Sequence, residues 1–222
     1  KNPLTPVQLS AQRLQKRYQD KLGDDSQVFR ECTDTIIKQV EVLKNLVNDF
    51  SRYARMPVTN PVLNDLNETI SDPILLFQDA HKEITFIFNR GEGIPPLYLD
   101  TEQIRRVMVN LLDNAVAAMS TTEGQIEVTT AYDGASRKAR VSVTDNGCGV
   151  PLSHTMKIFE PYYSTKKSGT GLGLAIVNSI IADHHGAVTV RANSPAGTVV
   201  TFELPVPEIS ADQEYGKQIA SL

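Results

Sequence analysis

The sequence has few cysteines, no long apolar run and no strong excess of either charge. Its two cysteines, Cys32 and Cys148, lie far apart and lack the paired spacing of a zinc site or a disulfide framework. No apolar stretch approaches the roughly 20 residues that cross a bilayer, and no charged-then-apolar signal segment opens the chain. Lysine and arginine total 22 against 26 for aspartate and glutamate, so the net charge of -4 gives no general attraction to nucleic acid or anionic membrane. We therefore expect a soluble chain in the reducing cytoplasm, without contact to nucleic acid or membrane.

The length and the start of the chain bound its organisation. With 222 residues and 41% hydrophobic content, the chain can fill the core of one large domain or of two smaller ones. Because it starts at Lys1 without a methionine, we expect a piece of a longer protein, whose parent could carry sensory segments or an anchor in the inner membrane.

Two apolar series with helical spacing open the chain. Their members step by three and four residues, which is typical of a helix that packs along another helix. The positions are Leu4, Val7, Ala11, Leu14 and Tyr18, then Ile36, Val40, Leu43, Val47 and Phe50. A break at residues 21–25 predicts an antiparallel helical hairpin over residues 1–55. A lone hairpin has too little partner surface, so we expect a homodimer with a four-helix bundle; a hairpin folded back on its own C-terminal domain is the alternative.

The remaining patterns predict a second domain over residues 62–205. Two prolines make residues 56–61 a linker, and residues 206–222 lack a convincing pattern and are expected to be a tail. Helical patterns cover residues 64–80, 101–119 and 172–184, with Gly186 as the expected C′ residue of the last helix. Strand patterns cover residues 84–89, 124–132, 139–144, 187–192 and 198–204, with a hairpin turn at Asp133 and Gly134. This order predicts an α+β fold, a two-layer sandwich of one mixed sheet covered by helices on one face.

Two asparagines stand out on the helix predicted at 101–119. Asn110 and Asn114 lie one turn apart on the same face, among apolar residues. A carboxamide left without a partner there costs about 1 to 3 kcal/mol. Mg²⁺ is a suitable partner, because it prefers oxygen ligands and takes only one or two from protein while phosphates and water complete its shell. The helix alone is equally compatible with two asparagines that bond to neighbouring backbone.

A first glycine-rich segment follows the strand predicted at 139–144. Asp145 precedes Gly147 and Gly149, which let the backbone approach a flat ligand closely. A carboxylate at this place can accept a hydrogen bond from an adenine amino group. A plain Asp-Asn-Gly turn after a strand is the alternative.

A second glycine-rich segment, with Gly169, Gly171 and Gly173, precedes the helix predicted at 172–184. It has neither the Lys-Ser/Thr pair of a P-loop nor the spacing of a dinucleotide fingerprint. Backbone N–H groups and the positive helix end can hold phosphate oxygens there, with Lys166 or Lys167 adding charge. A glycine turn before a helix is the simpler interpretation of this segment alone.

The stretch between these segments, residues 151–168, has the composition of a movable lid. Phe159, Tyr162 and Tyr163 can anchor it, although packing is the commoner role of aromatic residues. His184 and His185 end the last predicted helix without metal-like partners, so we expect them at the surface, where they compensate the helix dipole.

Four strings in this order resemble the N, G1, F and G2 boxes of the ATPase superfamily that includes gyrase, heat-shock chaperones, mismatch-repair proteins and sensor histidine kinases. They are NLLDNAVAAM from Asn110, DNGCGVP from Asp145, IFEPYYSTKK from Ile158 and KSGTGLGLA from Lys167. The opening KNPLTP also resembles the end of the phosphoacceptor box HEIKNPLTP of sensor histidine kinases, especially those of the nitrogen-regulation type.

The resemblance implies that the chain binds ATP or ADP with Mg²⁺. It makes Asn114 the main Mg²⁺ ligand with Asn110 as its helper, and it places Asp145 at the adenine. It gives Asn110 and Lys166 catalytic roles in phosphoryl transfer. The other cofactor contacts that it implies are Gly147, Gly149, Lys166, Lys167, Gly169, Thr170, Gly171, Leu172, Gly173, Leu174 and Thr198. Members that hydrolyse ATP commonly carry glutamate at the Asn110 position, and an amide cannot act as that base, so a kinase is favoured over a hydrolase.

The resemblance further implies a protein-histidine kinase whose phosphoryl group passes to an aspartate of a response regulator receiver domain. The phosphoacceptor would lie three residues before Lys1, and none of His81, His154, His184 and His185 has a matching context. Asn2 falls where the family often places a polar residue that orients water for dephosphorylation of the regulator. The alternatives are an ATP-hydrolysing relative and a non-catalytic dimerisation module with a vestigial pocket.

Overall fold

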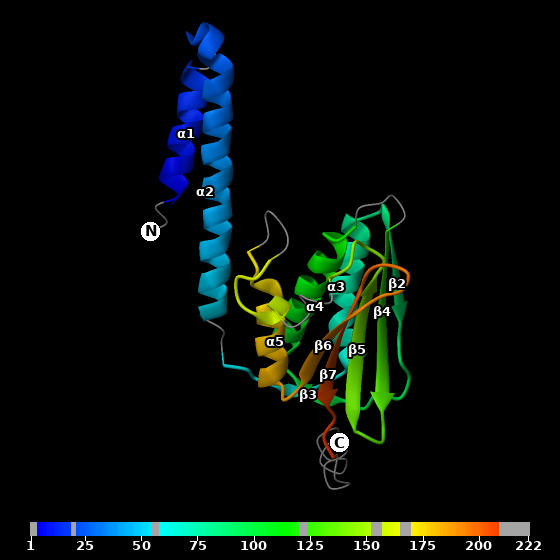
Figure 1. Cartoon of the computed structure of the whole chain (residues 1–222). Helices are drawn as coiled ribbons and strands as arrows, with labels where there is room; N and C mark the ends of the chain where they lie inside the picture. Colours follow the sequence, from blue (N-terminus) through cyan, green and yellow to red (C-terminus); the bar gives the residue numbers. More distant parts are fainter. Residues whose placement is uncertain are drawn as a thin grey trace. The chain divides into compact units, whose positions relative to one another are not determined.

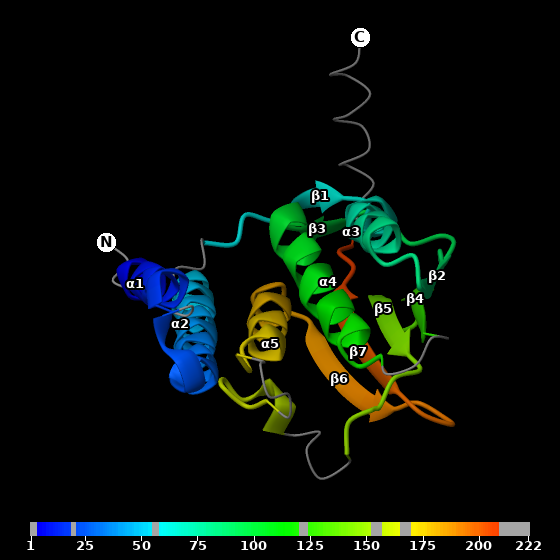
Figure 2. The same cartoon turned by 90° about the horizontal axis from the view of Figure 1, so that it is seen from above.

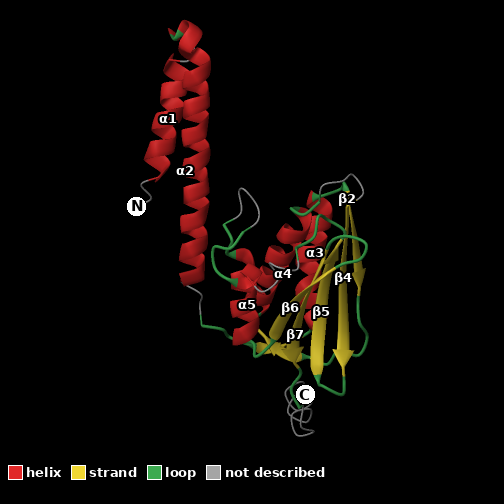
Figure 3. Cartoon of the chain, viewed as in Figure 1, coloured by secondary structure: helices red, strands yellow, loops and turns green. Residues whose placement is uncertain are grey.

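The computed structural model describes residues 4–18, 21–54, 58–119, 124–151, 157–164 and 170–208. The chain divides into two compact units, each described by itself: Lys1–Pro57 with Tyr162–Leu172, and Val58–Pro161 with Gly173–Leu222. Figure 1 follows the chain through its elements, and Figure 3 distinguishes the helices of the first unit from the mixed helices and strands of the second. The expected tail is described only as far as Glu208.

The first unit contains the predicted helical hairpin. Helix α1 (Leu4–Tyr18) leads through a short 3-10 turn, η2 (Gly23–Asp25), into the 29-residue helix α2 (Ser26–Ala54). Ala11 and Val40 of the expected apolar series are buried, and Gln15 Nε2 of α1 donates to Asp34 Oδ1 of α2 at 2.7 Å. None of the described helices, including α2, is long and apolar enough to cross a membrane.

Most of the two apolar series remains uncovered in the single chain. Val7, Leu14, Tyr18, Ile36, Leu43 and Val47 are 39 to 50% exposed. Two helices turn only one side toward each other, so apolar residues that lie on their flanks need another surface to cover them. We call these six residues the flank stripe.

The second unit is a two-layer sandwich. Its sheet has the strand order β2-β4-β5-β7-β6, in which β2 and β4 are parallel and all other neighbours are antiparallel. The strands are β2 (Ile84–Asn89), β4 (Gly124–Asp133), β5 (Lys138–Asp145), β6 (Ala187–Ala192) and β7 (Thr198–Pro205). Helices α3 (Leu66–Ala80), α4 (Thr101–Val116) and α5 (Gly173–Asp183) lie side by side on one face of this sheet (Figure 2). The α+β sandwich expected from the sequence is confirmed.

The core lies between the helices and the sheet. Alternate residues of the central strands are fully buried, including Val128 of β4, Val141 of β5 and Phe202 of β7. The opposite face of the sheet is polar: Glu203 of β7 accepts from Lys138 and Arg140 of β5, and the Arg140 hydrogen bond lowers the pKa of Glu203. The helices therefore cover one face of the sheet, and charged side chains occupy the other.

One small element was not predicted. Residues of the expected linker region lead into β1 (Val62–Asn64), which pairs antiparallel with β3 (Leu97–Leu99). Three-residue strands are too short to give a period-two pattern, and prolines flank both segments. Leu97 and Leu99 are nevertheless fully buried, so this ribbon closes one end of the core.

The end of α5 corrects two sequence predictions. His184 is not at the surface: it is 5% exposed, its Nδ1 bonds to Ile180 O at 2.8 Å, and its Nε2 accepts from Asp100 N–H at 2.9 Å. The left-handed residue is His185, with φ 58°, rather than Gly186. Gly186 N–H donates to Ile181 O and His185 N–H to Ala182 O, which is a Schellman motif with His185 at its left-handed position. Gly186 is needed for a different reason, because a Cβ there would collide with Glu203 O.

The left-handed backbone at His185 predicts a stabilising substitution. A non-glycine residue in this conformation costs roughly 1 kcal/mol, so His185→Gly should raise the free energy of unfolding by about that amount. His185→Ala is the matched control, since it removes the imidazole but keeps the Cβ, and it should give no comparable gain. Urea unfolding midpoints measure both; equal midpoints for the two variants would contradict the strain argument.

Candidate nucleotide site

Helix α4 carries the two asparagines singled out in the sequence. The Asp100 carboxylate caps its start by accepting from Gln103 N–H at 3.1 Å, and the helix then runs through Asn110 and Asn114. Asn110 Nδ2 donates to Arg106 O, one turn earlier, at 2.7 Å. This bond uses the amide nitrogen and leaves the carbonyl oxygen Oδ1 on the side that faces Gly173. Both asparagines are half-buried.

The first residue of α5 lies directly against this pair. A Cβ built on Gly173 would lie 3.2 Å from Asn110 Oδ1 and 3.6 Å from Asn114 Nδ2. A side chain here would require the Asn110 amide to shift by a few tenths of an ångström. The N-terminal N–H groups and the positive end of the 11-residue helix α5 therefore lie beside two carboxamides. Such a place can bind an anion through the N–H groups and, through the carboxamide oxygens, a cation bound to that anion.

The glycine segment before α5 is described from Thr170. Gly171 has φ 69°, and its carbonyl accepts from Tyr162 N–H at 3.0 Å; a Cβ on Gly171 would collide with the Tyr162 backbone. Leu172 is buried, whereas Thr170 and Leu174 are half-buried. Three predicted site residues near this segment, Lys166, Lys167 and Gly169, lie outside the described residues, as do Asn2 and His154.

Asp145 ends β5 and is held rigidly. It is 6% exposed, and its Oδ1 accepts from Gly147 N–H at 2.9 Å and from Thr198 N–H at 3.2 Å. Two backbone donors on one oxygen fix the plane of the carboxylate. Thr198, which the family resemblance alone implied, is thus a direct neighbour of Asp145.

Gly147 and Gly149 permit close backbone contacts on either side of Asp145. A Cβ on Gly147 would lie 2.5 Å from Ala118 O, and Cys148 N–H donates to this same carbonyl at 3.0 Å. Gly149 has φ 73°, and a Cβ there would lie 3.0 Å from Gly197 O. The glycines therefore bring the loop against the end of α4 on one side and the turn before β7 on the other.

Two residues of that turn were missed by the sequence analysis. Asn193 Nδ2 donates to Asp145 O at 2.9 Å, and Gly197, with φ 110°, packs its backbone against the same carbonyl. They lie between two predicted strands in the segment NSPAG, which has the composition of an ordinary turn. Only the hydrogen bonds to Asp145 reveal that this turn supports the site.

Helix α4 joins the parts of the site. Ala118 N–H donates to Asn114 O at 3.1 Å, and Ala118 O holds the Gly147 loop, so the asparagine turn and the Asp145 loop are adjacent. Among the residues whose positions are described, no cluster of three or more His, Cys, Asp or Glu could hold a metal ion. The oxygen donors near Gly173 are neutral amides.

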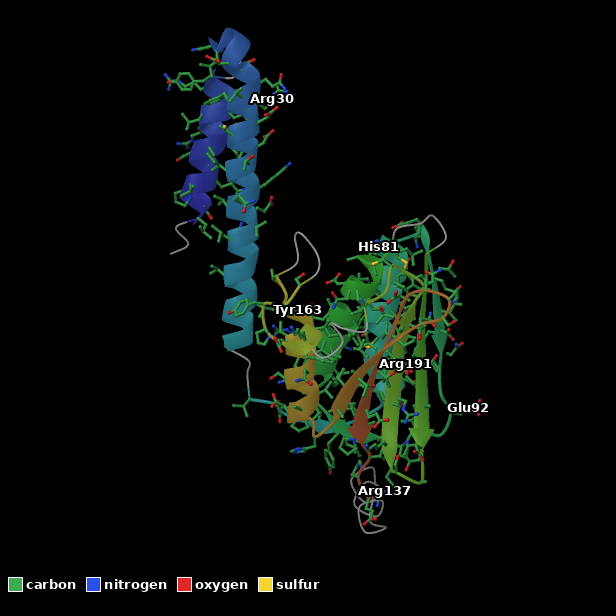
Figure 4. The ribbon with its side chains drawn as sticks, viewed as in Figure 1. Arg30, His81, Glu92, Arg137, Tyr163 and Arg191 are labelled. Carbon is green, nitrogen blue, oxygen red and sulfur yellow. The ribbon has the colours of Figure 1, made fainter. Side chains whose placement is uncertain are left out.

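Two histidines of the second unit, His81 and His184, have ring partners away from the candidate site. His81, which is labelled in Figure 4, directly follows the last residue of α3. Its Nδ1 lies 3.3 Å from Glu83 Oε1. Both ring nitrogens of His184 are engaged by the backbone of Ile180 and Asp100.

Both parts of the chain match known families. Residues 1–57 match the His Kinase A (phospho-acceptor) domain, and residues 99–208 match the histidine kinase-, DNA gyrase B- and HSP90-like ATPase family. The nitrogen regulation protein NtrY of Azorhizobium caulinodans is 34% identical over 203 residues, which cover 89% of this chain and 26% of NtrY. The signal transduction histidine-protein kinase AtoS of Escherichia coli is 31% identical over 208 residues, which cover 93% of this chain and 33% of AtoS. The chain thus spans about a quarter to a third of these curated relatives.

Solved structures are similar to the second unit and to most of the chain. The catalytic domain of histidine kinase ThkA is 33% identical with a TM-score of 0.59, covering 66% of this chain and 96% of the domain. Full-length ShkA in complex with AMPPNP is 26% identical with a TM-score of 0.67, covering 94% of this chain and 44% of ShkA. ThkA in complex with the response regulator TrrA is 25% identical with a TM-score of 0.70, covering 92% of this chain and 58% of ThkA. By its two matched domains, its fold and these relatives, the chain belongs to the sensor histidine kinase family.

Proposed function

We propose that this chain is the kinase core of a two-component sensor, which binds Mg-ATP and transfers the γ-phosphoryl group to a histidine that precedes Lys1 in the parent. The observation that carries the proposal is the contact of Gly173 with Asn110 and Asn114, next to the Asp145 loop. Helix α4 thus connects three features: the anion site at the start of α5, the two carboxamide oxygens that can bind a cation, and the buried acceptor Asp145. The ATP analogue AMPPNP in the ShkA structure supports the choice of nucleotide.

The residues divide into three roles. Asp145 accepts from the adenine amino group, while Gly147, Gly149 and Thr198 shape the surface on which the base lies. The start of α5 holds the phosphates through backbone N–H groups. The residues assigned to this phosphate contact are Thr170, Gly171, Leu172, Gly173 and Leu174, with Lys166, Lys167 and Gly169 proposed from the sequence alone.

Asn114 and Asn110 are proposed as the protein ligands of Mg²⁺. Their carboxamide oxygens are the kind of ligand that Mg²⁺ accepts, and the Arg106 bond leaves Asn110 Oδ1 facing the helix start. When bound, the ion offsets the charge of the phosphates. The protein's own part is to orient the γ-phosphate and to exclude water, which is most of what phosphoryl transfer requires.

Two alternatives are weaker. An amide at Asn110 cannot take a proton from water, which disfavours an ATP hydrolase. A vestigial pocket is disfavoured because Gly147, Gly149 and Gly171, among the described glycines of the site, are still required by a close backbone contact or a positive φ. The proposal places the core in the cytoplasm, where ATP is present.

We further propose a homodimer through the hairpin, with a response regulator receiver domain as phosphoryl acceptor and Asn2 orienting water for its dephosphorylation. The half-exposed flank stripe supports the dimer, because a second hairpin offers the matching apolar surface of a four-helix bundle. The ThkA complex with TrrA supports the regulator as partner. The proposed domains are residues 1–55 for dimerisation and 62–205 for catalysis.

Removal of the adenine acceptor should weaken nucleotide binding. Asp145→Asn keeps an oxygen for the Gly147 and Thr198 N–H groups but removes the second acceptor oxygen, so we expect a loss of about 5-fold to 150-fold in affinity, equivalent to roughly 1 to 3 kcal/mol. Asp133→Asn is the matched control, because this exposed carboxylate only bonds the β4–β5 turn. Calorimetric titration with Mg-ATP decides; an unchanged affinity of Asp145→Asn would remove Asp145 from the adenine site.

The hairpin should hold a dimer that does not depend on nucleotide. Light scattering at tens of micromolar should give a dimer for the full chain and a monomer for a shortened chain that begins at Asn60. Leu43→Glu, which places a charge in the flank stripe, should dissociate the full chain, whereas Lys38→Glu on an exposed helix position should not. A monomeric full chain, or a shortened chain that dimerises equally well, contradicts this interface.

The chain as it stands should bind nucleotide without labelling itself. The ring of His81 contacts Glu83, and the ring of His184 bonds to Ile180 O. A nucleophile that is misplaced by about 1 Å can lose a hundredfold in rate. With γ-³²P-ATP, a chain extended by His-Glu-Ile before Lys1 should acquire an acid-labile, base-stable phosphoryl group, and the unextended chain should not. Label on the unextended chain, or none on an extended chain that binds nucleotide, would show that the phosphoacceptor is misplaced.

A further inference from the structure

Three segments meet at Asp100, which has no role in the proposed nucleotide site. Its carboxylate Oδ1 accepts from Gln103 N–H at 3.1 Å and caps α4, while Oδ2 accepts from Asn60 N–H at 3.1 Å. Its own backbone N–H donates to His184 Nε2 at 2.9 Å. One residue therefore bonds the linker, the start of α4 and the end of α5.

Both ring nitrogens of the buried His184 are hydrogen-bonded to backbone groups at this junction. The ring is 5% exposed, and Ile180 O accepts from Nδ1–H at 2.8 Å, which leaves Nε2 as the acceptor for Asp100 N–H. A carbonyl on one side and an N–H on the other determine which ring nitrogen donates and which accepts. A buried polar ring satisfied in this way specifies how the two helix ends are placed.

The linker is attached to the same helix end by two further contacts. Thr59 Oγ1 bonds to Oε1 of the buried Gln103 at 3.2 Å, and strand β1 pairs with β3, which ends at Leu99 immediately before Asp100. Asn60 comes six residues after Ala54, the last residue of α2. The segment 58–60 is thus bonded to the start of α4 at two residues, Asp100 and Gln103.

Helices α4 and α5 then connect the junction to the site. They lie side by side in Figure 2, and their sequence directions are opposed: His184 meets Asp100 at one end, and Gly173 meets Asn110 at the other. Asn110 follows Asp100 by ten residues, which is roughly 15 Å along a helix. A stiff helix shifted at its start also shifts the side chains that it carries further along.

We propose that Asn60, Asp100 and His184 form a clasp that couples the hairpin to phosphoryl transfer by setting the position of α4 and α5 relative to the linker. The inference rests on the proposed function, because it takes the Asn110 and Gly173 contact as the ATP site. Asp100 and His184 are positioning residues. They touch neither the phosphate site at Gly173 nor Asp145, and they act on the γ-phosphate through the two helices.

The linker bond can be cut without touching the site. Asn60→Pro and Asn60→Ala both remove the asparagine side chain, but only the proline also removes the N–H that donates to Asp100 Oδ2. Asn60 precedes Pro61, a position that favours the extended backbone a proline tolerates. Asn60→Ala keeps this N–H and is the matched control. In the chain extended by His-Glu-Ile, Asn60→Pro should lower the rate of labelling by γ-³²P-ATP at least about fivefold, while its affinity for Mg-ATP stays within about twofold of the wild type. Asn60→Ala should match the wild type in both.

Each outcome decides between distinct claims. Equal labelling rates for the proline and alanine variants would overturn the clasp and leave the proposed function intact. A parallel fall of affinity and rate in Asn60→Pro would also overturn it, since the bond would then serve only the stability of the site. A wild-type extended chain that binds no nucleotide or acquires no label would instead refute the proposed function, and the clasp with it.

The other side of the clasp is tested by rescue. His184→Phe keeps a ring of similar size but removes the acceptor for Asp100 N–H, whereas His184→Gln can present its side-chain oxygen to the same donor. The glutamine variant should label faster than the phenylalanine variant at saturating ATP. Equal rates for two folded variants would show that the hydrogen bond to Asp100 does not position the helices.

Discussion

The packing of α4 against the sheet is the interaction on which the second unit depends. Its inward side chains are 0 to 2% exposed, and burial of each contributes about 1.5 to 3 kcal/mol. They are Ile104, Val107, Met108, Leu111 and Leu112. The outward side of the same helix presents Asn110 and Asn114, and its end holds the Gly147 loop through Ala118 O. A change in the buried side would therefore displace the site before any residue assigned to nucleotide was altered.

The site relies on neutral groups more than on charges. Carboxamides and backbone N–H groups can be half-buried on a helix without the desolvation cost of an isolated ion, which is far larger. Among the described site residues Asp145 is the exception, and two backbone donors satisfy one of its oxygens. Such a site has little charge of its own to hold an ion, so the charge that attracts Mg²⁺ arrives with the phosphates.

The sequence predicted those parts of the fold that have a long period or a defined turn. The strand at Ile84–Asn89 follows from its alternating pattern, and the hairpin turn after Asp133 follows from its turn residues. Gly173 lies next to Asn110 and Asn114, which belong to another of the sequence boxes that the family resemblance brought together. Features that depend on tertiary contacts were missed. The burial of His184 requires Asp100, 84 residues away, and the Asn193 bond to Asp145 spans 48 residues. No local pattern encodes a hydrogen bond across such a separation. The close approach of Gly186 to Glu203 O, 17 residues later, is equally invisible in the sequence.

Helix α4 also has a role in folding, because it is part of the connection between the parallel strands β2 and β4. The β4–β5 hairpin is local, but β2 and β4 run in the same direction and are separated along the chain by β3 and α4. A parallel pair needs such a crossover, and non-local pairings of this kind form slowly, so we expect edge strand β2 to join the sheet after the local β4–β5 hairpin has formed. The helix that carries the two asparagines is thus also the connection that completes the sheet. A ligand that holds α4 would protect the edge strand from local opening, although it touches no residue of that strand.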